Sequence, residues 1–166
     1  MELEELYDYK NRLMKDICSD ADVIRLVTGN ANAAVPNRKM PYTQVFPYEY
    51  IPDTVDDGKT YICFDVDVTG TPNDTTYSLV LYVWVLMHKS AMHPKSGGCA
   101  IDNIIIAINK LLNGSRYYGL GELKLEHVRR FKPALEYHGR ALTYSTRDFN
   151  MRPIKQNLPS NRKEGV

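Results

Sequence analysis

The chain has 166 residues, enough for one domain with a sizeable core, and its 21 Lys and Arg residues nearly balance its 20 Asp and Glu residues. A formal charge of +1 argues against a general attraction to nucleic acid or to an anionic membrane. The longest apolar run, residues 79–87, is far shorter than the roughly 20 residues of a membrane helix, and the acidic N-terminus is unlike a signal peptide, so we expect an intracellular product without a membrane partner.

Two helices are predicted at the start of the chain. Apolar residues recur at helical spacing over residues 3–17, with glutamates in the first turn where they suit the helix dipole. A second, shorter helix is predicted over residues 22–28. Ser19 or Asp20 would cap its start, and Gly29 would end it.

Residues 30–58 are predicted to form an extended crossing segment. Four prolines between residues 36 and 52 prevent a helix or an inner strand from continuing. The aromatic residues of this segment are too apolar for a free linker, so it should lie on a protein surface, either of its own domain or of a neighbour. Phe46, Tyr48 and Tyr50 are therefore candidate subunit contacts.

A cluster of aspartates accompanies the next predicted strand. Residues 62–68 alternate between apolar side chains and Cys63, Asp65 and Asp67, the pattern of a strand with one buried face. Asp65 and Asp67 could form a metal pair that serves an enzyme, or simply face solvent. Three further aspartates between residues 53 and 57 precede a turn, and no other metal-binding motif follows. The pattern favours an ordinary strand and leaves the metal-dependent enzyme as the alternative.

The following strand has two apolar faces. After a predicted loop over residues 70–75, alternate positions between residues 76 and 88 are apolar on both sides, and one side carries Tyr82 and Trp84. Such a strand is either central and sandwiched or covered by a second subunit. It is the strongest indication of oligomerisation in the sequence, and it makes Tyr82 and Trp84 candidate subunit contacts.

An exposed loop is predicted over residues 89–98. His88, His93, Cys99 and Asp102 could be imagined as zinc ligands around it, but their spacing fits no familiar zinc motif. The three cysteines of the chain include no closely spaced pair, which favours reduced structural thiols over a disulfide framework.

The remainder predicts a helix, two strands and a tail. Residues 101–112 carry an apolar stripe at helical spacing, from which Ile106 is displaced. Two strands with a bulge in the first and a turn over residues 133–136 follow. Basic and aromatic residues in these strands could contact nucleic acid, yet the acidic residues among them favour a mixed-charge solvated face. We therefore predict one domain over residues 1–150 and an extended tail over residues 151–166.

This order of elements resembles the head–tail joining and tail-completion proteins of tailed bacteriophages, in particular tail terminators of the lambda type. The resemblance covers most of residues 1–150 and rests on the runs "VFPYEYIPDT", "YICFDVDV", "LVLYVWVLMHK", "LLNGS", "YYGLGELKL" and "YHGRALTYSTRDFN". It implies an α+β fold: an antiparallel or mixed sheet of about four to five strands, with an N-terminal helix and one central amphipathic helix packed on one face.

The resemblance also implies a structural role without catalytic residues, cofactors or metals. Such proteins form a hexameric ring that caps the tail tube, stops its polymerisation and offers a surface to the neck. The implied partners are copies of the chain, the tail tube protein and a neck or connector protein, with DNA passing through the ring without specific binding. The implied location is the virion, after assembly in the host cytoplasm. Stopper and adaptor proteins of the neck are alternatives. Candidate contacts to the tube or neck are His93, Lys95, Arg152 and Lys155.

Overall fold

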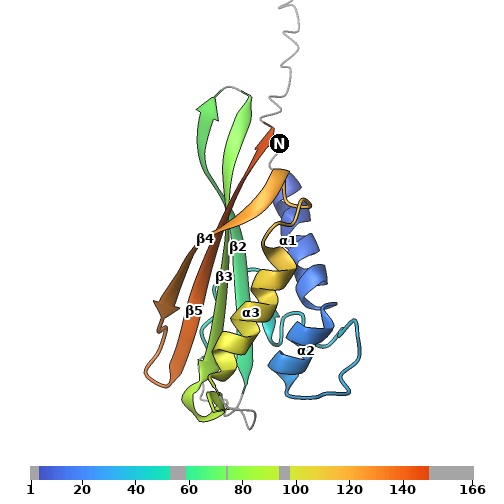
Figure 1. The fold of residues 1–166 in the computed structure, drawn as a ribbon, viewed down its shortest axis with the longest axis vertical. Coiled ribbons are helices and arrows are strands. Elements are labelled where there is room, and N and C mark those ends of the chain that lie inside the picture. Colours follow the sequence, from blue (N-terminus) through green and yellow to red (C-terminus); the bar gives the residue numbers. More distant parts are fainter. Residues whose placement is uncertain (1–3, 53–58, 74, 94–97, 150–166) are drawn as a thin grey trace, which may run out of the picture.

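Figure 1 shows the computed structural model, which describes residues 4–52, 59–73, 75–93 and 98–149. Its helices lie on one side of a five-stranded sheet, so the predicted α+β class is confirmed. The elements are α1 (Glu4–Ile17), α2 (Ala21–Thr28), β1 (Val45–Phe46), β2 (Thr60–Asn73), β3 (Thr76–His88), the 3-10 turn η1 (Lys89–Ala91), α3 (Ala100–Leu112), β4 (Leu120–Phe131) and β5 (Tyr137–Phe149).

The sheet is mixed, with the strand order β1-β2-β3-β5-β4. β1 pairs with β2 in parallel, whereas the β2–β3, β3–β5 and β4–β5 pairs are antiparallel. β5 lies between β3 and β4, so α3 connects two parallel strands that are separated by a third. The predicted bulge in β4 is present as a register shift between Leu125 and His127. β3 lies in the middle of this order. The sequence offered two explanations for its apolar faces, a central position or cover by a second subunit, and the first of these positions is observed.

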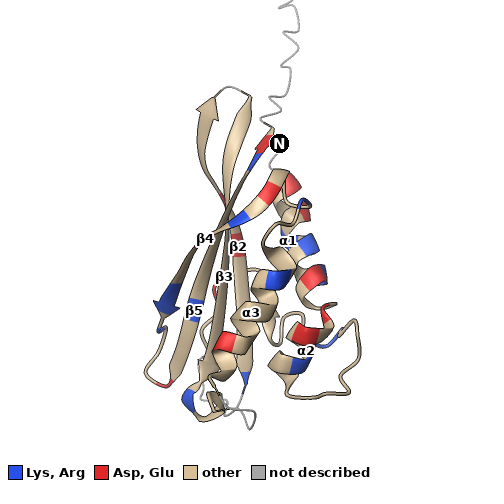
Figure 2. Ribbon diagram, viewed as in Figure 1, with Lys and Arg blue, Asp and Glu red and all other residues tan. Residues whose placement is uncertain are grey.

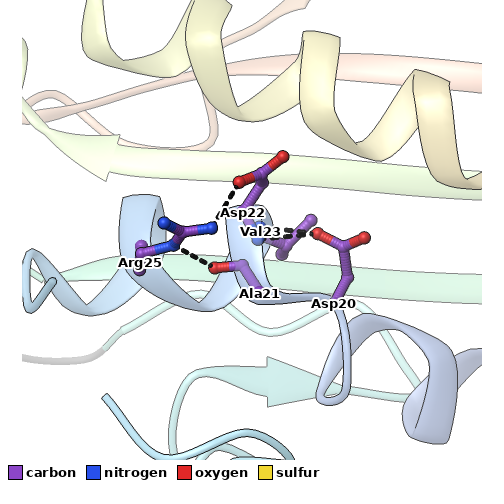
Figure 3. A network of polar contacts seen from close by, with 5 residues as sticks. All are labelled: Asp20, Ala21, Asp22, Val23 and Arg25. Carbon is purple, nitrogen blue, oxygen red and sulfur yellow. Dashed lines mark hydrogen bonds and ion pairs between the residues drawn. The ribbon is translucent and has the colours of Figure 1, made fainter. Parts of the chain in front are cut away.

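The second helix begins and ends at residues that the sequence predicts as its caps. Asp20, and not Ser19, is the N-cap of α2: its Oδ1 accepts hydrogen bonds from the backbone N–H groups of Asp22 and Val23, at 3.0 and 2.9 Å (Figure 3). Gly29 follows the helix with φ of 65°, a left-handed conformation that glycine adopts readily. Arg25 closes the network with an ion pair to Asp22 at 2.7 Å.

The main core lies between the helices and one face of the sheet. Phe64, Val83 and Tyr144 project from three neighbouring strands and are fully buried. Ile104 and Ile108 belong to the same cluster from α3, and Leu13 and Ile17 belong to it from α1. Burial raises the pKa of the Tyr144 hydroxyl.

Two tyrosines attach α1 to distant parts of the chain. The Tyr9 hydroxyl donates to Oδ2 of Asp148 in β5 at 2.5 Å. The Tyr118 hydroxyl, from the connection between α3 and β4, donates to Oδ2 of Asp16 at 2.5 Å. Burial and the acceptor carboxylates raise the pKa of both phenols, so both are donors at neutral pH. Arg12 adds a hydrogen bond to the carbonyl of Tyr117.

The loop predicted over residues 70–75 is largely strand, and that prediction is wrong. β2 continues to Asn73 and β3 begins at Thr76, with Gly70 paired to Ser78 and Asn73 to Thr76. The Asn73 side chain accepts hydrogen bonds from the backbone and hydroxyl of Thr75, so it stabilises a tight turn. The register shifts on either side of Gly70 absorb the irregular sequence. Figure 1 shows this hairpin extending past the helices.

Candidate contact surface

The face of the sheet opposite the helices carries an aromatic pair. Tyr82 and Trp84 stack with their ring centroids 5.7 Å apart and an interplanar angle of 13°. Both are half-buried. The helices contribute to the cluster on the other face, whereas the described hydrophobic cluster on this side contains no helix residue. We call this side the open face; it places Tyr82 and Trp84 together, as the sequence predicts from their spacing.

The crossing segment covers one end of the open face. Phe46 is 5% exposed and stacks on Tyr50 at 4.1 Å and 14°, against Tyr61 of β2. These two predicted contact residues therefore pack on their own domain. Tyr48 is 47% exposed and remains available at the rim of the cluster.

The covering segment also buries part of this side of β2. The alternation predicts one buried face, and on the opposite side Tyr61 and Cys63 are buried as well, beneath the aromatic residues of the crossing. Burial raises the pKa of the Cys63 thiol to about 11. Only from Asp65 onward does this side of β2 become accessible.

Charges differ between the two sides of the aromatic pair. On β2, Asp67 is exposed, and Asp65 forms an ion pair with Lys10 of α1 at 2.5 Å. On β4, the strand register places exposed Lys124, His127 and Arg129 beside open-face residues of β5. Figure 2 shows basic residues at the far end of β4. Asp65 is thus already paired, and Glu126, which accepts a hydrogen bond from the Ser145 hydroxyl, lies among the cations of β4, so the remaining contrast is between Asp67 on one margin and the surplus cations of β4 on the other.

The possible metal ligands do not come together. Within the described ranges, no group of three or more His, Cys, Asp or Glu side chains could hold a metal ion. Asp53, Asp56 and Asp57 lie outside those ranges. His88 is buried, with Nδ1 2.8 Å from the Ser90 hydroxyl and its ring edge-on against Tyr137. Its position is explained by packing.

Of the predicted tube or neck contacts, only His93 can be placed. It is exposed just after η1. Lys95, Arg152 and Lys155 lie outside the described residues, as does the predicted tail over residues 151–166.

A groove that sequence analysis missed lies between α3 and the β4–β5 hairpin. It has a volume of about 490 Å³, and its lining includes Ile101, Arg130 and Arg140. The only signal in the sequence was the density of basic residues in the last two strands. Their convergence depends on the pairing of Arg130 with Arg140 across the strands.

Comparison with known proteins identifies one family. A family model described as YomW matches residues 7–146, from α1 into β5. The name is a phage-derived one, of the Bacillus SPbeta type. No curated protein matches the chain. None of the described helices has the length and apolarity needed to cross a membrane.

Proposed function

The chain belongs to the phage-related YomW family, and we propose that it is a structural protein of the head–tail junction, namely a tail terminator. In this role it forms a hexameric ring that caps the tail tube, stops its polymerisation and provides the attachment surface for the neck. The ring works by contact alone, without catalytic residues, cofactors or sequence-specific DNA binding. It is assembled in the host cytoplasm and remains in the virion, with DNA passing through it.

The open face supports an assembly role most directly. Stacked aromatic residues that remain half-exposed on a central strand are typical anchors of protein interfaces, because they bury a large area at a small entropic cost. We assign Tyr82 and Trp84 to a contact with a neighbouring subunit, with Tyr48 at its rim. Phe46 and Tyr50 support this surface from within the chain.

The charges on this face favour a directional contact. Asp67 on the β2 margin can meet Lys124 and Arg129 on the β4 margin of another copy, which orients the two molecules as they associate. A ring requires such a heterologous contact, in which two different patches meet and the rotation closes. His93, with Lys95, Arg152 and Lys155, is assigned to the tube or the neck.

Deletion of the gene from the phage or prophage that carries it tests the proposal by electron microscopy. A terminator predicts overlong tails beside unattached, DNA-filled heads. Tails of normal length that fail to join heads would instead indicate a stopper or an adaptor in the neck. Particles with normal morphology and infectivity would refute a role at the junction.

A further inference from the structure

The groove between α3 and the β4–β5 hairpin combines an apolar lining with cations. Met92, Cys99 and Ile101 line it together with Arg130, Lys132 and Arg140. The volume of about 490 Å³ is within the usual range of specific pockets and can accept a large side chain. An occupant of this groove should therefore carry an aromatic or aliphatic anchor flanked by negative charges.

The cations of the groove lack enough negative charge inside the chain. Arg130 is directly opposite Arg140 in the β4–β5 pairing, and like charges in such positions repel one another. Arg140 is partly compensated by Asp102 of α3, whose Oδ1 lies 3.3 Å from its Nε. Arg130 forms no ion pair with any described residue, and the carboxylate that attracts Lys132, that of Glu136, is already paired with Lys89. Carboxylates from outside the chain would relieve this repulsion.

The outer side of α1 has the complementary chemistry. Tyr7 is 69% exposed, and Glu4 and Asp8 flank it on the same side of the helix. Glu4 and Asp8 are four residues apart, a spacing at which like charges destabilise a helix. The helix dipole accounts for Glu4 in the first turn but less for Asp8 in the second. Neither carboxylate has an ion-pair partner among the described residues.

One molecule cannot place its own Tyr7 in its own groove. The start of α1 and the start of α3, where the groove opens, lie at opposite ends of the molecule (Figure 1). The first turns of α1 in another copy carry the matching charge and an exposed aromatic anchor. Because the two patches differ, each copy can accept one neighbour and donate to another, which gives the head-to-tail contact of a ring.

We propose that the first two turns of α1 bind in the groove between α3 and the β4–β5 hairpin of the next copy. Tyr7 is the anchor, and Glu4 and Asp8 face Arg130 and Lys132. This inference rests on the proposed function, since it specifies how the ring subunits contact one another. The open face is a separate surface. It shares the β4 edge with the groove, so a neighbour that arrives at this edge can cover both.

A cysteine cross-link tests the contact in the assembled particle. Cys99 lines the groove and is partly exposed, whereas Cys18 and Cys63 are buried. Tails are isolated from a phage that encodes the full chain with Tyr7→Cys, and are then mildly oxidised. Disulfide-linked chains should form a ladder on a non-reducing gel. The ladder should vanish when Cys99→Ser is added, and Tyr42→Cys, at a site that is 63% exposed, should give none.

Charge reversal supplies a second test that leaves the fold intact. In the Tyr7→Cys background, Arg130→Glu should lower the cross-linking yield about tenfold because it places a carboxylate opposite the acidic helix. Adding Asp8→Arg should restore much of the yield. Lys110→Glu is the matched control, since it reverses a charge at an exposed position of α3 that lies outside both the groove and the open face, and it should have no effect.

The outcomes separate this inference from the proposed function. A ladder that depends on Cys99 and responds to both charge reversals supports the contact. Tails that contain the chain but give no ladder, or a ladder that Arg130→Glu leaves unchanged, overturn the α1–groove contact and leave the terminator role standing. Absence of the chain from tails and joined particles overturns the proposed function and the contact together.

Discussion

Replacing Trp84 by Ala should weaken assembly more than folding. Trp84 and Val83 are neighbours in β3 but face opposite sides of the sheet. Val83 is fully buried beneath the helices, whereas Trp84 is half-buried on the open face. Val83→Ala therefore serves as a matched control that damages the core of the same strand without touching the proposed interface.

The two variants should differ in how much folding and association free energy they lose. Trp84→Ala loses its stacking on Tyr82 and part of its buried area, a cost of about 1–3 kcal/mol in the free energy of unfolding. Val83→Ala removes two carbon atoms from a packed core, a cost of about 2–3 kcal/mol once the cavity is included. If Trp84 anchors a neighbour, its loss should cost a further 2 kcal/mol or more in association, about a 30-fold weakening.

Urea unfolding of the isolated chain and ring yield on tail ends measure the two effects separately. We expect Val83→Ala to unfold at a lower urea concentration yet to form rings wherever it is folded. Trp84→Ala should remain folded under the same conditions and give far fewer rings. Equal ring yields for the two variants at matched folded fraction would show that Trp84 serves only its own domain.

Three further predictions concern stability and can be measured by urea unfolding. Asp20→Ala should cost about 1 kcal/mol because it removes the cap of α2, while Asp20→Ser should retain most of it. Gly139→Ala should cost about 1–3 kcal/mol, since its Cβ would lie 2.6 Å from the backbone oxygen of Val85; Gly70→Ala, with open space around it, should be nearly neutral. Burial raises the pKa of the Cys63 thiol from 9.0 to about 11. The stabilisation that depends on a neutral thiol at this position is therefore complete below pH 9, and about 2–3 kcal/mol of the free energy of unfolding should be lost as the pH rises through 11. Cys63→Ala should flatten this decline.

Elements governed by local chemistry could be predicted from the sequence. Asp20 and Gly29 bound α2 because a carboxylate cap and a left-handed glycine act within a few residues. The apolar stripe of α3 and the alternation in β2 also report directly on the helix-covered face. The two apolar faces of β3 left open whether the strand is central or covered by a second subunit, and the structure places it in the middle of the sheet.

Features that depend on distant partners could not be predicted in this way. Cys63 lies on the same side of β2 as Asp65, and the path of the crossing segment buries Cys63 while it leaves Asp65 partly accessible. The groove requires Arg130 and Arg140 to meet across a hairpin and α3 to begin beside them. Strand register and connection path are tertiary properties, so alternation within one strand carries no information about them.

The bond from Tyr9 to Asp148 has a consequence for the order of folding. It joins residues 139 positions apart, so α1 cannot be fully secured until β5 has been synthesised and has paired beside β3. The apolar side of α1 packs on β2 and α3, which come earlier in the chain, so those contacts do not depend on β5. A chain that ends before β5 lacks the hydrogen bond that fixes the first half of α1 to the sheet.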